Sequence, residues 1–191
     1  MNTNSGYTVH FIFRRVSPRM RAGLLEFWES NRHHWIETTR QPQAKRIFTV
    51  SDTPRARLST LLTNVACVAL TNTGSIVGAA WIKVAMMPVD KSKAQLIYFQ
   101  RMYIAPEHRS ARLANTLLNT FHKNLKRCNK RSPLIKYLLA ENANPKLKTP
   151  ATRRLFIRKG FVFMGFNSIG NEIWKLALPP TSSPAINPVL R

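Results

Sequence analysis

The stretch RMYIAPEHRSARLANTLLNTF, residues 101–121, constrains the fold more than any other part of the sequence. It begins as a strand-like run, turns at Pro106 and continues as a helix. In that helix, large apolar residues recur every four positions, at Leu113, Leu117, Phe121 and Leu125. The first backbone N–H groups of such a helix have no partner within it and lie at the positive end of its dipole. The joint therefore serves architecture alone or holds a phosphate-bearing ligand.

Strand-like and helix-like segments alternate along the whole chain. β-rich runs bounded by turn residues predict strands at 9–16, 65–70, 76–86, 93–104, 134–140, 161–166 and 172–178. Helical spacing and N-terminal signals predict helices at 19–35, 54–62, 109–127 and 151–159. This order is typical of an α/β (α+β) domain, with helices on the faces of a mixed sheet, over residues 1–178. The Pro/Ser-rich residues 179–191 are expected to form a disordered tail.

Positive charge dominates the composition, because 30 Lys and Arg stand against 8 Asp and Glu, a net charge of +22. The segment between His108 and Ala140 contains basic but no acidic residues, namely Arg109, Arg112, Lys123, Lys126, Arg127, Lys130, Arg131 and Lys136. Such a chain attracts nucleic acid strongly, so we expect a nucleic-acid partner. A basic surface that serves only solubility is the alternative. An anionic membrane is less favoured, because no long basic helix with a broad apolar face is predicted.

The cysteines and the hydropathy limit the class of protein further. Cys67 and Cys128 form no pattern of a disulfide framework or a zinc site, so we expect no metal and a reducing cytoplasm. No apolar run reaches the roughly 20 residues of a membrane helix, and the N-terminus shows no secretory signal. Nothing in the sequence favours one oligomeric state over another.

The order of elements, together with the joint, resembles the GNAT superfamily of acyl-CoA-dependent N-acyltransferases over about residues 7–178. The pyrophosphate loop of that family is matched by Ile104, Pro106, Arg109, Arg112 and Ala114. A second family segment is matched by Thr149, Ala151, Leu155-Phe156 and Gly160-Phe161, and the start of a central strand by Gly74, Ile76-Val77 and Gly78.

The resemblance implies a mixed, mostly antiparallel sheet of about seven strands with flanking helices. It also implies that acetyl-CoA, or another acyl-CoA, donates an acyl group to an amine, which the charge of this chain places on or near nucleic acid. The residues that would bind the donor are Met102, Ile104, Arg109, Ser110, Ala111, Arg112, Leu113, Ala114 and Phe156. Within this set, backbone N–H groups of 110–114 would hold the pyrophosphate, and one in 102–104 would polarise the thioester carbonyl.

Two positions depart from the family pattern. Arg112 replaces the first loop glycine, where its side chain would either crowd or neutralise the phosphates. Phe156 replaces the tyrosine that often serves as general acid, and a phenylalanine cannot donate a proton.

Four residues are candidates for catalysis. Tyr98 and Gln100 lie where the family often places a glutamate, and each could hold a water that accepts the proton of the amine. Glu141, at the end of the predicted fifth strand, is a second candidate, with a surface ion pair as the alternative. Arg101 could face DNA or a carboxylate of the acceptor.

Two further hypotheses remain open. The segment with Arg101-Met102, Pro106 and Ser110-Ala111-Arg112 is also similar to phage DNA-modification proteins of the Mom type. This would make the chain a DNA base-modifying enzyme, from a phage or mobile element and acting in the host cytoplasm. Alternatively, the domain has lost catalysis and binds nucleic acid or a host protein, as Arg112 and Phe156 would allow.

Overall fold

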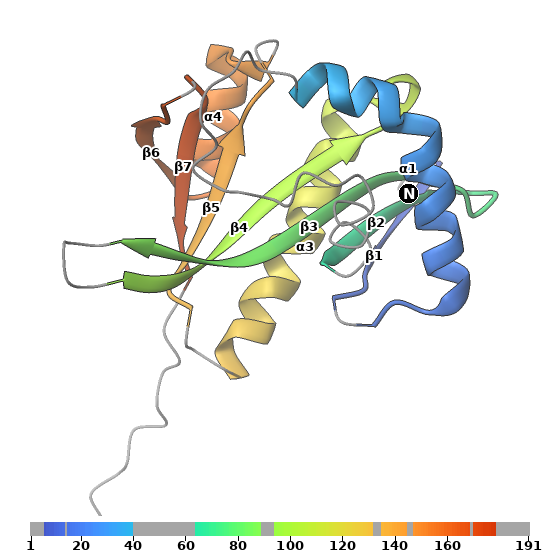
Figure 1. The fold of residues 1–191 in the computed structure, drawn as a ribbon, viewed down its shortest axis with the longest axis horizontal. Helices are drawn as coiled ribbons and strands as arrows, with labels where there is room; N and C mark the ends of the chain where they lie inside the picture. Colours follow the sequence, from blue (N-terminus) through green and yellow to red (C-terminus); the bar gives the residue numbers. More distant parts are fainter. Residues whose placement is uncertain are drawn as a thin grey trace, which may run out of the picture.

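The computed structural model describes residues 6–13, 15–39, 64–88, 94–131, 135–144, 147–168 and 170–178 (Figure 1). The predicted helix at 54–62 and the predicted tail at 179–191 lie outside the described residues. No helix among the described residues is both long enough and apolar enough to cross a membrane.

A seven-stranded sheet forms the centre of the molecule (Figure 1). Its spatial order is β1 (Tyr7–Phe11), β2 (Val65–Thr71), β3 (Ile76–Pro88), β4 (Ala94–Ile104), β5 (Tyr137–Asn142), β7 (Glu172–Ala177) and β6 (Phe161–Phe166). β4 and β5 pair in parallel, and the other neighbouring strands pair antiparallel. The predicted mixed, mostly antiparallel sheet is confirmed.

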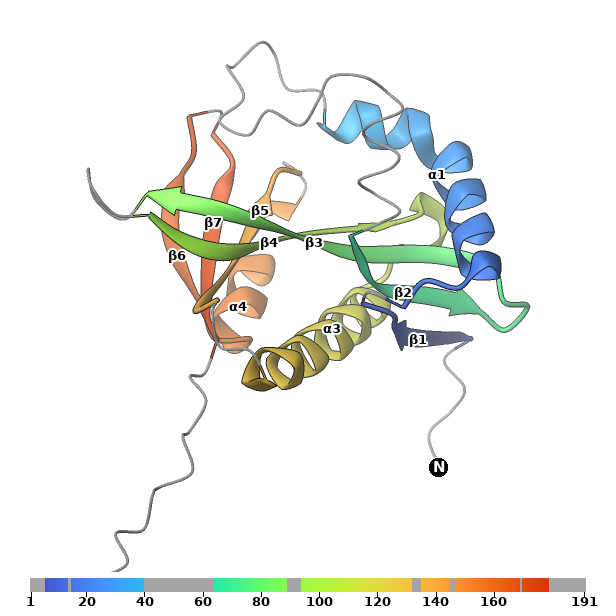
Figure 2. The same ribbon diagram turned by 60° about the horizontal axis from the view of Figure 1, so that its bottom comes forward.

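Helices cover both faces of this sheet (Figure 2). α1 (Pro18–Thr39) packs on one face, and α3 (Ala111–Arg131) and α4 (Pro150–Arg158) pack on the other. A single 3-10 turn, η1 (Pro106–His108), connects β4 to α3. Gly160, with a φ of 85°, follows α4 in the left-handed conformation that ends many helices.

Among the strand boundaries that differ from the prediction, the ends of β1 and β5 are the most informative. The first strand was predicted over 9–16 but ends at Phe11, which is the last residue paired with β2, opposite Cys67. β5 was predicted to end at Ala140, but it continues through Glu141 and Asn142, which pair with β7. The sequence predicted a loop here because both residues are polar. Their partners Arg101 and Glu172, which hold the two side chains in place, are distant in the sequence.

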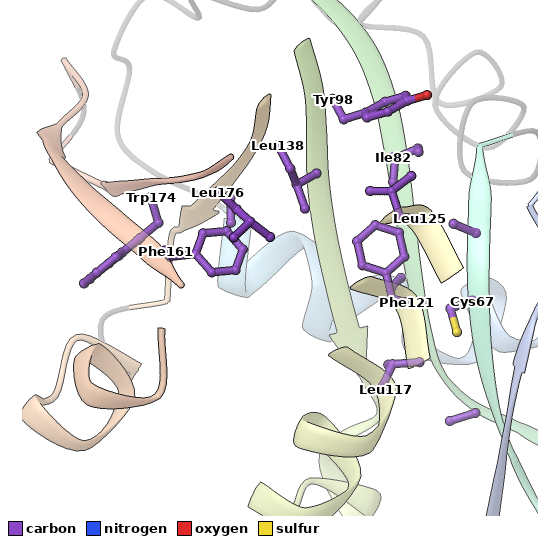
Figure 3. Close-up of a cluster of buried hydrophobic side chains, with 14 of the residues drawn as sticks. Cys67, Ile82, Tyr98, Leu117, Phe121, Leu125, Leu138, Phe161, Trp174 and Leu176 are labelled. Carbon is purple, nitrogen blue, oxygen red and sulfur yellow. The ribbon is translucent and has the colours of Figure 1, made fainter. Parts of the chain in front are cut away.

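Two hydrophobic cores hold the helices to the sheet. The apolar stripe of α3 is buried as predicted, with Leu117, Phe121 and Leu125 at 0% exposure, and it packs on β2–β5 and β7 (Figure 3). Full burial of a side chain of this size stabilises the fold by about 2 kcal/mol. On the other face, Leu24, Phe27 and Trp28 of α1 pack on Trp81 and Tyr103.

The two parallel strands at the centre of the sheet pair over a short length only. Their register runs from Tyr98↔Leu138 to Gln100↔Ala140. β4 then stays paired with β3 as far as Ile104, while β5 stays paired with β7 as far as Asn142. The strands therefore part beyond Gln100, and each has an edge that faces the gap.

Candidate active site at the parting of β4 and β5

Arg101 and Glu141 lie at the point where the two strands separate. Each is the first residue beyond the last register pair, and an Arg101 guanidinium nitrogen lies 3.0 Å from Glu141 Oε2. The Glu141 side chain is 9% exposed and the Arg101 side chain 40% exposed. The arginine also lies over the Phe99 ring, 5.4 Å from its centroid. An accessible cation is thus held at the gap by a largely buried carboxylate.

Two asparagines from the β6–β7 turn complete the surroundings of Glu141. Asn167 Nδ2 and Asn171 Nδ2 donate to Glu141 Oε1 over 2.8 and 2.7 Å. The alternative expectation for Glu141, a surface ion pair with a lysine, is therefore wrong: the carboxylate is largely buried, pairs with Arg101 and accepts hydrogen bonds at both oxygens. Sequence reasoning missed both asparagines, because asparagine in a short turn is expected for its backbone conformation alone.

Tyr98 and Gln100 do not join this cluster, because consecutive residues of a strand point to opposite faces. Tyr98 is 8% exposed and lies among the buried side chains on the α3 face (Figure 3). Gln100 is 4% exposed, and its Oε1 lies 2.8 Å from His122 Nε2 on the same face. Both residues face away from Arg101 and Glu141, which lie on the α1 face of the sheet.

His122, the partner of Gln100, is a buried histidine of α3. It is 7% exposed and lies against the rings of Phe121 and Phe161. Burial, reinforced by the charges of Lys126 and Lys159, lowers the pKa of His122 to about 3. The imidazole is therefore neutral at physiological pH, and the tautomer protonated at Nε2 donates to Gln100.

The joint after β4 is an ordered turn into a capped helix. The Ser110 hydroxyl accepts from the Leu113 amide over 3.1 Å, and the Ser110 carbonyl accepts from the Ala114 amide over 3.0 Å. Arg109 turns back, so that its Nε donates to the Ile104 carbonyl over 2.9 Å. Ser110 is thus the N-cap of α3, and its hydroxyl and carbonyl satisfy two amides of the first helical turn.

The predicted donor-binding residues divide into exposed and buried members. Arg109, Ser110, Ala111 and Arg112 are exposed at the joint. Leu113 and Ile104 are buried, at 3% and 7%, in the core under α3, and Met102 and Ala114 are partly buried against it. The side chains of these four residues shape the joint from below, so a ligand would meet their backbone.

Phe156 lies in an aromatic cluster under α4. Its ring stacks on Trp174 at 5.0 Å and contacts the Phe161 ring edge-on at 5.2 Å. The cluster borders Glu172, whose carboxylate accepts from Trp174 Nε1. Phe156 is therefore engaged in core packing, with ring contacts to Phe161 and Trp174.

The sequence matches no protein-family model and no curated protein. Solved structures, in contrast, share its fold. The ribosomal-protein-S5-alanine acetyltransferase of Vibrio fischeri is 12% identical with a TM-score of 0.57, and the match covers 93% of this chain and 96% of that one. A GNAT superfamily phosphinothricin acetyltransferase from Sinorhizobium meliloti, solved with acetyl-CoA, is 17% identical with a TM-score of 0.54 over 93% and 95%.

A third similar structure is a GNAT family acetyltransferase from Streptococcus pneumoniae, 16% identical with a TM-score of 0.53 over 91% of this chain and 99% of that one. All three matches extend over nearly the whole of both chains. At such low identities the similarity establishes the fold, and the chain has the GNAT acetyltransferase fold. The fold class expected from the sequence is confirmed.

Proposed function

We propose that this protein is an acyl-CoA-dependent N-acyltransferase that uses acetyl-CoA or a related acyl-CoA. One observation carries the proposal: β4 parts from β5 at Gln100 and leads, within six residues of its end, into the capped N-terminus of α3. This arrangement provides an open strand edge next to a set of outward amides. An acyl group on a long arm fits the first feature, and a pyrophosphate fits the second.

The residues at the joint suit an acyl-CoA in charge and shape. Of the predicted amides of 110–114, those of Leu113 and Ala114 already donate to Ser110, so the amides of 110–112 would hold the pyrophosphate. The exposed Arg112 would neutralise it in place of the usual glycine. The bound donor would supply an activated thioester carbonyl. The edge of β4 over 102–104, which faces the gap, would donate an N–H to that carbonyl oxygen.

We assign Glu141 a positioning role. Its Oε1 accepts from two amides and its Oε2 accepts from Arg101, so most of its acceptor capacity is already used. Arg101, which is 40% exposed, would orient an anionic group of the acceptor beside the gap. Water would then accept the proton of the amine, because Tyr98 and Gln100 lie on the opposite face of the sheet.

The acceptor that we propose is an amine on a nucleic acid or on a molecule bound to one. The support is the net charge of +22 and the exposed arginine at the gap. A phosphate next to the amine is the group that Arg101 would recognise best. The proposal is tested with radiolabelled acetyl-CoA and three acceptor pools, namely total RNA, DNA and protein. Label in the RNA or DNA pool is expected, whereas label in the protein pool alone would contradict this acceptor.

A second candidate function is DNA base modification of the Mom type, favoured by the position of Arg101 at the gap. In that case Arg101→Ala would abolish base modification but leave acetyl-CoA binding intact. DNA is recovered from cells that express the unaltered protein or Arg101→Ala, and the masses of its bases are measured. N-acetylation adds a known mass to a base, so a modified base of another mass would favour the Mom type.

A further inference from the structure

We propose that the outer surface of α3, α4 and the adjacent strand β6 binds a single-stranded nucleic acid. This surface lies on the side of the sheet opposite α1 (Figure 2). The inference rests on the nucleic-acid partner of the proposed function, but it does not depend on acyl transfer. It adds where the strand would lie and which form of nucleic acid would be preferred.

The helices on the two faces of the sheet differ in their acidic residues. α3 and α4 contain no acidic residue in their sequences. α1 contains Glu26, Glu29 and Glu37, whereas Glu141 and Glu172 are used in ion pairs with Arg101 and Arg153. Six basic side chains of the α3–α4 surface form no ion pair with an acidic residue in the part of the chain that the structure describes, namely Lys123, Lys126, Arg127, Arg154, Arg158 and Lys159.

The two helices that carry these basic residues are neighbours. Lys159, at the end of α4, donates to Asn119 in the middle of α3, so the two helices are in contact at their outer side. Lys126 and Lys159 both act on the pKa of His122, which lies between them. Positive groups brought this close repel one another, and a polyanion would relieve that repulsion.

α3 also presents a line of exposed polar residues at helical spacing, formed by Arg112, Thr116, Asn119, Lys123 and Arg127. From its first to its last residue this line extends roughly 22 Å, the length of several nucleotides. These side chains can donate hydrogen bonds to phosphate oxygens, and such contacts carry no sequence information. The helices would therefore follow the backbone of a strand.

Two exposed aromatic side chains continue the surface at the edge of the sheet. Phe163 and Phe166 of β6 are 43% and 61% exposed, and their rings contact each other at 5.4 Å. Phe163 lies opposite Trp174, whose ring stacks on Phe156 of α4, so the pair is on the α4 side. Exposed rings beside a basic surface are suited to stack unpaired bases. A duplex hides its bases, so a single strand is favoured.

The test is fluorescence anisotropy with labelled single-stranded RNA, single-stranded DNA and duplex DNA of equal length, in the absence of acetyl-CoA. The basic surface is tested by Lys123→Glu with Arg127→Glu, and the control is Arg19→Glu with Arg21→Glu on exposed positions of α1. Both double variants change the net charge equally. The α3 variant is expected to weaken binding at least tenfold and to reduce the salt slope by about two, and the control by much less.

The aromatic pair is tested separately by Phe166→Ala, with Val162→Ala as its control. Val162 is 60% exposed on the same strand but points to the opposite face. Phe166→Ala is expected to weaken single-strand binding about tenfold without changing the salt slope, because stacking involves no charge. Circular dichroism of all variants verifies folding, and Lys123→Gln with Arg127→Gln serves as a milder form.

Several results would overturn the inference. Equal losses in the α3 and α1 double variants would assign binding to net charge alone. Tighter binding of duplex DNA, or of anionic vesicles, would exclude a single strand as the preferred ligand. A dimer that is lost in Phe166→Ala would assign the aromatic pair to contacts between copies. Acetyl-CoA binding should be unchanged in every variant, so failure of the proposed acyl transfer would be seen independently.

Discussion

Two glutamate–arginine pairs lie on neighbouring strands of the sheet but on opposite faces. Glu141 of β5 pairs with Arg101 on the α1 face, and Glu172 of β7 pairs with Arg153 on the α4 face. The Glu172 side chain is 0% exposed, and it also accepts from Asn142 and from Trp174. Its Arg153 partner comes from α4, so this pair joins a helix to the sheet.

The arginines of the two pairs are similarly exposed, 40% for Arg101 and 46% for Arg153, so the pairs differ in where they lie. Arg153 contacts a carboxylate enclosed by the aromatic cluster, and that carboxylate has all its partners within the fold. Arg101 is at the gap between β4 and β5, where a ligand could contact it. We infer that the Glu172 pair stabilises the fold and that the Glu141 pair serves the site.

The largest expected effect on stability is that of Glu172→Ala. It would leave Arg153, Asn142 and Trp174 without a buried acceptor, and we expect a loss of about 3 kcal/mol in the free energy of unfolding. Urea denaturation measures this value, with Glu26→Ala on the exposed side of α1 as the control. A loss below about 1 kcal/mol would show that the pair is not structural.

Glu141→Gln is expected to have the opposite profile. The amide keeps a similar shape and can still accept from Asn167 or Asn171, so we expect a stability loss of about 1 kcal/mol or less. It no longer fixes the Arg101 guanidinium by charge, and we expect acyl transfer to fall at least tenfold. Thiol release from acetyl-CoA with an amine acceptor measures this. Unchanged transfer would remove Glu141 from the site.

The dependence of stability on pH should distinguish two buried titratable groups on the α4 side of the sheet, His122 and Glu172. The pKa of His122 is lowered from 6.5 to about 3, so its contribution is complete above pH 6.5 and is lost as the pH falls toward 3, because the unfolded chain takes up the proton first. The slope can approach about 1.4 kcal/mol per pH unit. Denaturation of His122→Gln between pH 7 and 5 should show a flatter profile than the unaltered protein.

Glu172 acts at lower pH. Burial alone would raise the pKa of Glu172, but hydrogen bonds from Asn142, Arg153 and Trp174 outweigh it and hold the pKa below 4.5. Its stabilisation is therefore complete above pH 4.5 and is lost as the pH falls through the lowered value. Glu172→Gln should remove this second, more acidic loss and leave the His122 phase. A single phase that both variants abolish would contradict separate groups.

The smallest expected effect is that of Phe156→Tyr. Its ring is held by Trp174 and Phe161, so an added hydroxyl would have little freedom to move toward the gap. We expect a stability change within about 1 kcal/mol and less than a threefold change in acyl transfer. A large gain in transfer would show that this position can supply a general acid after all.

The sheet, its helices and the joint could be predicted because each depends on local spacing and turn residues. The four-residue repeat of α3 and the Pro106 turn are examples, and both are present in the structure. The cluster around Glu141 could not be predicted, because Asn167 and Asn171 reach it only when β7 lies next to β5. Because consecutive residues of a strand point to opposite faces, the sequence could have placed Gln100 and Arg101 on different faces. It could not have shown that Arg101 meets Glu141, because that contact depends on the pairing of β4 with β5.

The central claim is that the joint between β4 and α3 binds an acyl-CoA, and calorimetry tests it most directly. Acetyl-CoA would be titrated at low and at moderate salt, with 3′-phospho-ADP and heparin as comparison ligands, because a chain of charge +22 binds any polyanion loosely. We predict a dissociation constant of about micromolar that persists at moderate salt and is tighter than that for 3′-phospho-ADP. Binding that disappears with salt, or that does not distinguish acetyl-CoA from heparin, would contradict the account.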